Sequence, residues 1–358
     1  MNELIHLGAG PSFIPDEVKK AAIKEMRNFN DSELSALEIS HRTKEFEKVN
    51  ASSEEGIREL LGVPDNFFVI FVQGGATLQN TTIPLNFSNG KENLGYIITG
   101  EWSKKTYIDG SKLRKASILF DGIETNYTTV PSNEIIKEGS DSSLVFLTSN
   151  ETINGVQVKE YNNIGKSLII DMSSDIASRK IDWSNITCTY AGAQKNLGTS
   201  GVTIVVGDKN KLVDNGLTSY LNFQNHIEKS SLYNTPPVFS IVVLNEMLRW
   251  IKNNGGVAHF QEESKKKALL LYDVLDSNKE KFVLSVEKDA RSYSNVVFDF
   301  HEQATLERFL KEAGEAKFHG INGHRSVGGV RISIYNSIDL DKVKKIAQFI
   351  SDFMKNLT

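Results

Sequence analysis

Two residues that each follow an apolar run, an aspartate and a lysine, are the best candidates for chemistry in this chain. Asp171 ends the run Leu168–Asp171, and Lys195 stands 24 positions later in AGAQKNLG, just past the run Thr187–Ala191. The small residues around Lys195 would let its amine touch a flat ligand. Pyridoxal phosphate requires this pairing, because the lysine forms the Schiff base and the acid keeps the pyridine nitrogen protonated. The alternative is a solvated loop lysine and a capping aspartate.

Further residues could complete such a site. Gln73–Thr77 follows the apolar run Phe67–Val72 and opens an expected helix, where free backbone N–H groups would bind an anion; a plain strand-to-helix turn is the alternative. Trp102 follows the run Leu94–Thr99 and could stack on a flat ring or belong to the core. Histidine and arginine can clamp an anionic substrate, and the candidates are His41, Arg42, His324, Arg325 and Arg331.

Several familiar motifs fail in this sequence. Gly165-Lys166-Ser167 lacks the first glycine of a P-loop, and Gly8-Ala9-Gly10 lacks the last glycine of a dinucleotide fingerprint. Neither HExxH nor GxSxG occurs. His319 and His324 are five apart, which suits neither face of a helix. We therefore expect no metal site.

Apolar runs that alternate with helical patterns would position these residues. The run at 67–72 reads as a buried parallel strand, and the runs at 94–99, 144–148, 168–171, 187–191 and 202–206 repeat this pattern. Helices are expected at 45–61, 241–252, 261–275 and 340–357, and a strand at 296–300. Together they predict an α/β fold with helices on both faces of a sheet, and a hinge at the Asn253–Gly256 turn.

Length and charge limit the classes of protein. The 358 residues exceed one small domain, and 41 basic against 45 acidic residues give no basic excess for nucleic-acid binding. No apolar run approaches the roughly 20 residues that span a bilayer, and the N-terminus does not resemble a secretory signal. The single cysteine, Cys188, excludes an internal disulfide framework. We expect a cytoplasmic enzyme without nucleic-acid or membrane partners.

At this point specific segments carry a resemblance. AGAQKNLGTSGVTIVV, NETINGVQ, GHRSVGGVRISIYN, TPPVFSI and the opening HLGAGPS are similar to the phosphoserine aminotransferase family, among the class V aminotransferases of the fold-type I pyridoxal-phosphate group. The resemblance runs from His6 to Phe353. It implies a large domain with a mainly parallel seven-stranded sheet flanked by helices, and a smaller α+β C-terminal domain. We expect residues 16–255 in the large domain, and 1–15 with 256–358 in the small one.

The resemblance also assigns roles by position. Lys195 would form the Schiff base, Asp171 would face the pyridine nitrogen, Trp102 would stack on the ring and Thr152 would reach its hydroxyl. The cofactor phosphate would be held by Ala76, Thr77 and Gln194, and by Asn234 and Thr235 of the other subunit of a homodimer. Arg331 would bind the substrate α-carboxylate. The substrate phosphate, or the distal carboxylate of glutamate, would be gripped by His41, Arg42, His324 and Arg325, some of them from the other chain.

The implied reaction transfers an amino group reversibly between L-glutamate and 3-phosphohydroxypyruvate, giving 2-oxoglutarate and O-phospho-L-serine in serine biosynthesis. The four-carbon analogue, 4-phosphohydroxythreonine in vitamin B6 synthesis, is a second possible substrate. Thr77 and Asn80 depart from common family residues near the phosphate grip. Two alternatives stay open: a class V aminotransferase or lyase acting on an unphosphorylated substrate, and a non-catalytic binding protein with the same fold.

Overall fold

A seven-stranded sheet forms the centre of the larger part of the molecule. The computed structural model describes residues 4–138, 141–161 and 165–357. From edge to edge the strands are β2 (Phe67–Val72), β10 (Thr203–Asp208), β9 (Ile186–Gly192), β8 (Ser167–Asp171), β5 (Leu144–Thr148), β3 (Leu94–Ile98) and β4 (Ala116–Asp121). All pairs from β9 to β4 are parallel, which confirms the expected α/β fold with a mainly parallel seven-stranded sheet.

The prediction that residues 67–72 and 202–206 form parallel strands was wrong about their pairing. β2 pairs with β10, and this pair is antiparallel, as is the pair of β10 with β9. A continuous apolar run reports that both faces of a strand are buried, and it carries no information on the direction of the neighbour. Both faces of β2 are indeed buried: Phe67, Val69 and Phe71 enter one core, whereas Phe68, Ile70 and Val72 enter the other.

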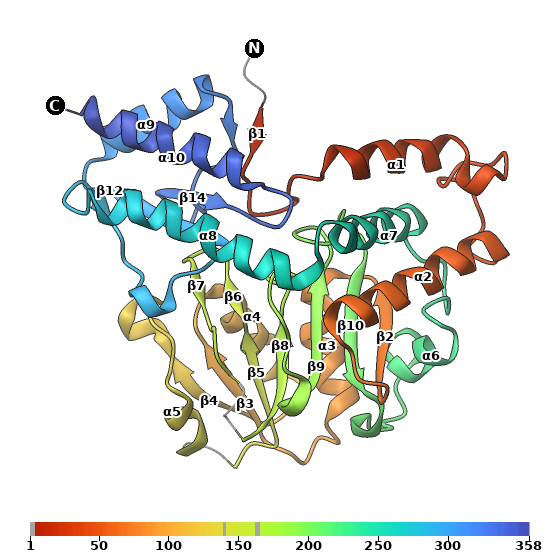
Figure 1. Cartoon of the computed structure of the whole chain (residues 1–358). Helices are drawn as coiled ribbons and strands as arrows, with labels where there is room; N and C mark the ends of the chain where they lie inside the picture. The colour runs from red at the N-terminus through yellow and green to blue at the C-terminus, as the bar shows by residue number, and fades with distance from the viewer. Residues whose placement is uncertain (1–3, 139–140, 162–164, 358) are drawn as a thin grey trace.

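Helices cover both faces of the sheet, as Figure 1 shows. On one face lie α2 (Lys44–Leu61) and α7 (Val238–Asn253), which pack against each other. On the other lie α3 (Gly75–Phe87) and α4 (Glu101–Gly110), each following a strand directly. The expected helix 45–61 is α2: the Thr43 side chain caps its start, and Gly62 ends it in the left-handed region at φ 61°.

A second apolar core lies above the sheet, around a three-stranded sheet of β11 (Phe282–Val283), β12 (Asn295–Phe300) and β14 (Val330–Ser333). Helices α9 (Gln303–Glu315) and α10 (Leu340–Lys355) pack into it. Ile5 and Leu7 also belong to this core, and β1 (Ile5–His6) pairs with β13 (Phe318–His319). The chain therefore begins in the part of the molecule where it ends (Figure 1).

The two cores are joined by one long helix, α8 (Gly256–Asp276). Its first residues, Val257 and Phe260, lie in the core of the large sheet, whereas Ala268, Leu271 and Leu275 lie in the second core. Gly255, at φ 94°, separates α8 from α7. The domain limits 1–15, 16–255 and 256–358 stay a prediction, since α8 contributes to both cores.

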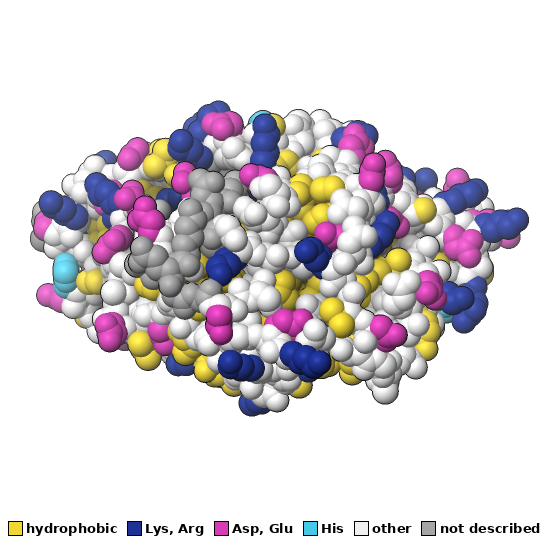
Figure 2. Space-filling view, turned by 90° about the horizontal axis from the view of Figure 1, so that it is seen from below, with side chains coloured by type: hydrophobic (Ala, Val, Ile, Leu, Met, Phe, Trp, Pro, Cys, Tyr) yellow, Lys and Arg dark blue, Asp and Glu magenta, His cyan; other side chains and the backbone are white. Residues whose placement is uncertain are grey.

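Further elements of the described chain are α1 (Asp16–Arg27), α5 (Asn133–Glu138), β6 (Asn150–Glu151), β7 (Val156–Gln157) and α6 (Phe223–Glu228), besides several short 3-10 helices. Figure 2 shows the face below the sheet, where basic and acidic side chains are interspersed. No helix in the described part of the chain combines the length and apolar character needed to cross a bilayer.

Candidate active site

A cavity of about 370 Å³ opens at the carboxyl edge of the parallel strands, where ligands bind in open α/β sheets. Thr148 ends β5, Asp171 ends β8, and Lys195 follows β9. The first turns of α3 and α4 form further walls, and Ala9, Gly10, His324 and Arg331 reach the cavity from the N- and C-terminal parts of the chain. The lining residues are Ala9, Gly10, Gly75, Ala76, Thr77, Asn80, Trp102, Lys105, Thr106, Thr148, Asn150, Thr152, Asp171, Ser173, Ser174, Gln194, Lys195, His324 and Arg331.

Lys195 and Asp171 form the charged centre of this cavity. Burial lowers the pKa of Lys195, and the charge of Asp171 opposes that shift. Burial raises the pKa of Asp171, whereas Lys195 and two donors from Ser173 oppose it. The Ser173 N–H and Oγ–H donate to Asp171 Oδ1 at 2.9 and 2.6 Å. Ser173 thus orients the carboxylate and leaves Oδ2 without a donor among the described residues.

The segment before α1 holds the lysine loop in place. The Ser12 N–H donates to the Gln194 carbonyl at 2.9 Å, and the Ser12 hydroxyl donates to the Lys195 carbonyl. A Cβ on Gly10 would lie 3.3 Å from Lys195 Cγ, and Gly10 has a φ of 134°. Only glycine therefore fits beside the lysine stem without strain.

The start of α3 is a backbone anion site. Gly74 precedes the helix at φ 88°, and no side chain caps the first turn. The N–H groups of Gly75, Ala76 and Thr77 consequently lack intrahelical acceptors and carry the positive end of the helix dipole. A Cβ on Gly74 would lie 2.5 Å from the Leu78 side chain, so this turn also requires glycine.

Trp102 forms another wall from the first turn of α4. The Trp102 Nε1–H donates to the Thr152 hydroxyl at 3.0 Å, which fixes the plane of the indole. Lys195 Nζ lies 5.9 Å from the centroid of the indole ring. With 38% of its surface exposed, Trp102 presents an aromatic face to the cavity and is no core residue.

Arg331 and His324 supply cations from the second core. Arg331 lies on β14 and donates from Nη1 to the Thr152 carbonyl at 3.3 Å, while its Nε is buried and has no partner. An unpartnered buried donor is costly, so an acceptor of a ligand is expected there. His324 Nδ1 lies 2.7 Å from the Ser326 hydroxyl. Burial and the nearby charges of Arg331 and Arg325 lower the pKa of His324.

The structure brings only part of the predicted site together. Ala76, Thr77, Trp102, Thr152, Asp171, Gln194, Lys195, His324 and Arg331 line the cavity, whereas His41, Arg42, Arg325, Asn234 and Thr235 do not. Asn234 and Thr235 instead contact Gln73, just before α3. The Asn234 side-chain amide donates to Gln73 Oε1 at 3.4 Å, and Gln73 Nε2 donates to the Thr235 carbonyl at 3.1 Å. Arg42 is exposed, and His41 is buried with Nε2 unpartnered.

Sequence reasoning missed several lining residues. Ser173 is two positions after Asp171, the spacing at which an aspartate commonly accepts from its own backbone. Gly10 was dismissed with the failed dinucleotide motif, although its positive φ and its place beside Lys195 give it a role. Lys105 stands one turn after Trp102 in α4, a spacing that could have marked it.

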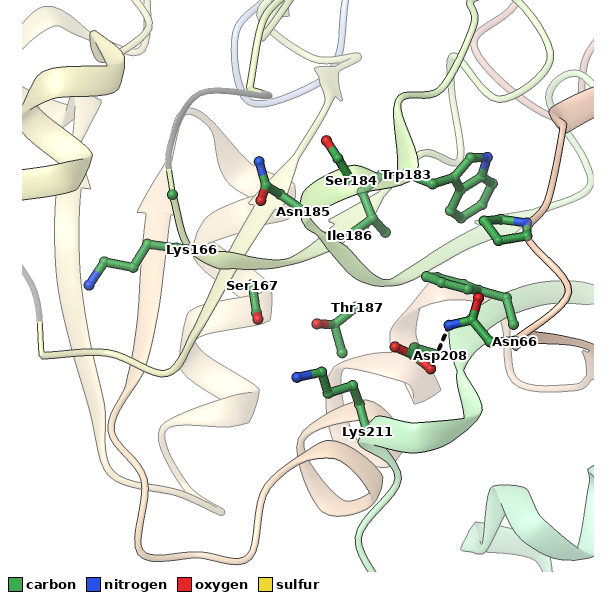
Figure 3. Close-up of a pocket in the computed structure, with 13 residues that line it drawn as sticks. Asn66, Lys166, Ser167, Trp183, Ser184, Asn185, Ile186, Thr187, Asp208 and Lys211 are labelled. Atoms are coloured by element: carbon green, nitrogen blue, oxygen red, sulfur yellow. Dashed lines mark hydrogen bonds between the residues drawn. The ribbon is translucent and has the colours of Figure 1, made fainter.

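A larger cavity, about 550 Å³, lies at the opposite edge of the sheet. Figure 3 shows it between the start of β8 at Ser167, the start of β9 at Ile186 and the end of β10 at Asp208. Lys166 and Lys211 reach it from separate segments, and the Asn66 amide donates to the Asp208 carboxylate at 3.0 Å. This edge holds the amino ends of the parallel strands, so it lacks the position that favours ligands.

Neither a metal-binding cluster nor a reactive thiol is found among the described residues. The described residues contain no cluster of three or more His, Cys, Asp or Glu side chains that could hold a metal ion. Cys188 is buried within β9, away from any loop, and burial raises the pKa of its thiol well above the ordinary value. A thiol of this kind does not act as a nucleophile.

The fold and the Lys195–Asp171 centre define a pyridoxal-phosphate-dependent transferase of fold type I. The family model for class-V aminotransferases matches residues 5–346. A phosphoserine aminotransferase of Geobacillus kaustophilus is 40% identical, with 99% of each chain covered. One solved phosphoserine aminotransferase, studied for radiation damage of its Schiff base, superposes with a TM-score of 0.95 at 38% identity, covering 99% of this chain and 100% of that one. Another, from Trichomonas vaginalis with pyridoxal phosphate bound, gives 0.91 at 32% identity, covering 97% and 99%. The chain therefore belongs to the class-V aminotransferases and, within them, to the phosphoserine aminotransferase family.

The residues present fit pyridoxal phosphate. The cavity offers the half-buried amine of Lys195, a carboxylate oxygen on Asp171 without a donor among the described residues, and an uncapped helix start at Gly75–Thr77. These are partners for an aldehyde, a pyridinium N–H and a phosphate, in that order. The Trp102 indole adds a flat apolar wall between them.

Proposed function

We propose that the chain transfers an amino group reversibly between L-glutamate and 3-phosphohydroxypyruvate, giving 2-oxoglutarate and O-phospho-L-serine. One observation carries the proposal: the cavity has a half-buried lysine and a buried carboxylate at its floor and the unpartnered Nε of Arg331 in its wall. The lysine and the carboxylate serve the cofactor, and Arg331 serves an anionic amino acid. The named relatives at about 40% identity support this choice of reaction.

Lys195, Asp171, Trp102, Thr152 and the first turn of α3 would hold the cofactor in this proposal, with Gln194 beside its phosphate. When bound, pyridoxal phosphate supplies an electron sink for the pair left on the amino-acid α-carbon. Asp171 would keep a proton on the pyridine nitrogen, since its Oδ2 accepts no hydrogen bond from the described residues. Ser173 keeps that carboxylate aimed by occupying Oδ1.

Lys195 is the proposed general base and acid. As a base, its amine takes the proton from the substrate α-carbon. As an acid, it then gives a proton back. A base works best with a pKa near the working pH, and burial moves the pKa of Lys195 in that direction. Gly10 has no side chain and therefore leaves room for the lysine stem to move between these two proton transfers.

Arg331 is the proposed partner of the substrate α-carboxylate, since its guanidinium presents a planar pair of donors. The distal phosphate or carboxylate needs further cations. His324 lines the cavity, and Arg325 follows it on the same loop. We place His41 and Arg42 of a second copy there too, with Asn234 and Thr235 of that copy at the cofactor phosphate, so that a homodimer shares its sites.

The proposal has wider consequences for the cell. The enzyme acts in the cytoplasm, in serine biosynthesis, and 4-phosphohydroxythreonine of vitamin B6 synthesis fits the same clamp. The phosphate lies one carbon beyond the amino carbon in O-phosphoserine and two carbons beyond it in 4-phosphohydroxythreonine. One set of cations can therefore bind either phosphate.

A half-reaction assay tests the proposal. The purified holoenzyme is mixed with O-phosphoserine, with 4-phosphohydroxythreonine, with glutamate and with serine, and conversion of the cofactor from its aldehyde to its amine form is followed by absorbance. The phosphorylated amino acids and glutamate should convert it, and serine should not. Conversion by serine at an equal rate would instead support an unphosphorylated substrate, and no conversion at all would support a binding protein.

A further inference from the structure

Glu151, the residue before Thr152, is a carboxylate with no role in the proposed reaction. Glu151 ends β6 and has 0% of its surface exposed. Its side chain accepts three hydrogen bonds, all from the first turn of α4: Oε1 from the Ser103 N–H at 2.8 Å and the Ser103 hydroxyl at 2.6 Å, and Oε2 from the Trp102 N–H at 3.1 Å. Burying a charge is costly unless it is fully hydrogen-bonded, so this arrangement requires a reason.

The start of α4 supplies that reason. Gly100 precedes the helix and has no side chain that could accept from the first N–H groups. Those groups need acceptors, which a neighbouring Ser, Thr, Asp or Asn ordinarily supplies. Glu151 accepts from these groups although it lies on β6, 49 residues after Trp102 and 48 residues after Ser103. Its negative charge also suits the positive end of the helix dipole.

Gly100 leaves the space that the Glu151 carboxylate occupies. A Cβ at this position would lie 2.6 Å from the Glu151 carboxyl carbon. The φ of Gly100 is 175°, extended backbone that any residue adopts, so the backbone does not demand glycine here. Space for the carboxylate is the remaining requirement.

Two consecutive residues thus hold both halves of Trp102. Glu151 binds its backbone N–H, and Thr152 accepts from its indole Nε1–H at 3.0 Å. The opposite end of the β6–β7 turn is anchored as well, because Gly155 donates to the Glu151 carbonyl at 3.0 Å.

We infer that Glu151 is a positioning residue, which caps α4 from outside the helix and thereby sets the indole of Trp102 against Lys195. The inference rests on the proposed function only in taking Trp102 as a wall of the cofactor site. Glu151 itself is fully buried and does not line the cavity, and its charge opposes the lowering of the pKa of Lys195 by burial.

Glu151→Gln is the main test, since the amide keeps the shape but turns one acceptor into a donor facing an N–H. Hydrogen exchange is measured in the cofactor-free protein, so the readout needs neither cofactor nor turnover. The peptide covering residues 101–105 should exchange about tenfold faster than in the unchanged protein. Glu101→Gln is the matched control, because it removes an exposed carboxylate from the same helical turn and should leave this exchange unaltered.

Gly100→Ala provides a second route if Glu151→Gln does not fold. It leaves the carboxylate in the chain but displaces it by the added methyl, and it should accelerate the same peptide. Unaltered exchange in a folded Glu151→Gln or Gly100→Ala protein overturns the inference, whether or not the protein proves to be an aminotransferase.

A double-mutant comparison then tests whether Glu151 acts through Trp102. In the holoenzyme, Glu151→Gln and Trp102→Phe should each weaken cofactor affinity, and the double variant should be no weaker than the worse single variant. Additive losses overturn the positioning role, because they would mean that Glu151 acts independently of the indole.

Discussion

The charge pair at the floor of the cavity is the residue-scale feature with the clearest pH consequence. Burial lowers the pKa of Lys195, and Asp171 is the largest influence in the opposite direction. Asp171→Asn removes that influence, so the pKa of Lys195 should fall further below the ordinary lysine value. The measurement is the pH dependence of amine labelling in the cofactor-free protein, with the Lys195 peptide quantified by mass spectrometry.

The labelling midpoint of Lys195 should move to lower pH in Asp171→Asn, since an amine reacts only when it is deprotonated. Exposed lysines in the same digests are the internal control. A midpoint that stays in place or rises would show that Asp171 does not stabilise the lysine charge.

Sequence reasoning located this pair because each member follows an apolar run at a sheet edge. It could not find Glu151 or Ser173, whose partners depend on how separate segments meet: Glu151 acts on residues 48 and 49 positions earlier. Conversely, His41 was proposed from its pairing with Arg42 and Asn234 from the resemblance, and neither lines the cavity of its own chain. The strand positions were predictable from buried runs, whereas the antiparallel pairing of β2 with β10 was not.

At the scale of elements, the start of α3 depends on one glycine. Gly74 combines a φ of 88° with a Cβ position 2.5 Å from Leu78, while Gly62 at the end of α2 has a φ of 61° and nothing within 4 Å. Gly62→Ala should cost about 1 kcal/mol of unfolding free energy through backbone strain alone. Gly74→Ala should cost more, because the clash shifts the first turn of the helix, and it should also weaken binding of the cofactor phosphate.

Urea unfolding of the two cofactor-free variants separates strain from clash, and cofactor titration reports the anion site. Equal losses of stability, with full cofactor affinity in Gly74→Ala, would contradict the role given to the first turn of α3.

Helix α8 carries a second element-scale feature, the buried lysine that ties it to the segment before α10. Lys267 has 1% of its surface exposed, and its Nζ donates to the carbonyls of Tyr335 at 2.9 Å and Ile338 at 2.7 Å. Burial lowers the pKa of Lys267 to about 7. Between that value and the ordinary value of about 10.4, the unfolded chain holds a proton that the folded chain has released.

The contribution of Lys267 to the unfolding free energy should therefore rise with pH across this window, by about 1.4 kcal/mol per pH unit. Lys267→Met removes the titrating group and keeps the apolar stem. The difference in unfolding free energy between the parent and Lys267→Met, measured at fixed protein concentration from pH 7 to pH 9.5, should shift in favour of the parent as pH increases. A difference that is constant with pH would show that Lys267 stays charged in the folded state.

At the scale of the whole molecule, the proposed clamp for the distal anion takes residues from two chains. Arg42 is exposed and lies outside the cavity. Leu34 and Leu37, on the same segment of the chain, are 45% and 65% exposed and would be covered if this segment lay in a dimer interface. A symmetric dimer would place each copy's Arg42 at the other copy's site, which is the arrangement we propose.

Subunit mixing tests this arrangement. Arg42→Ala and Lys195→Ala homodimers should each have little activity with phosphoserine, and Arg42→Ala should keep its cofactor affinity. When equal amounts are dissociated and reassociated, half of the dimers are mixed, and each mixed dimer has one site with both residues intact. About a quarter of the parent's activity should return. If Arg42 served the site of its own chain, no mixed site would be complete, and the mixture would be no more active than its components.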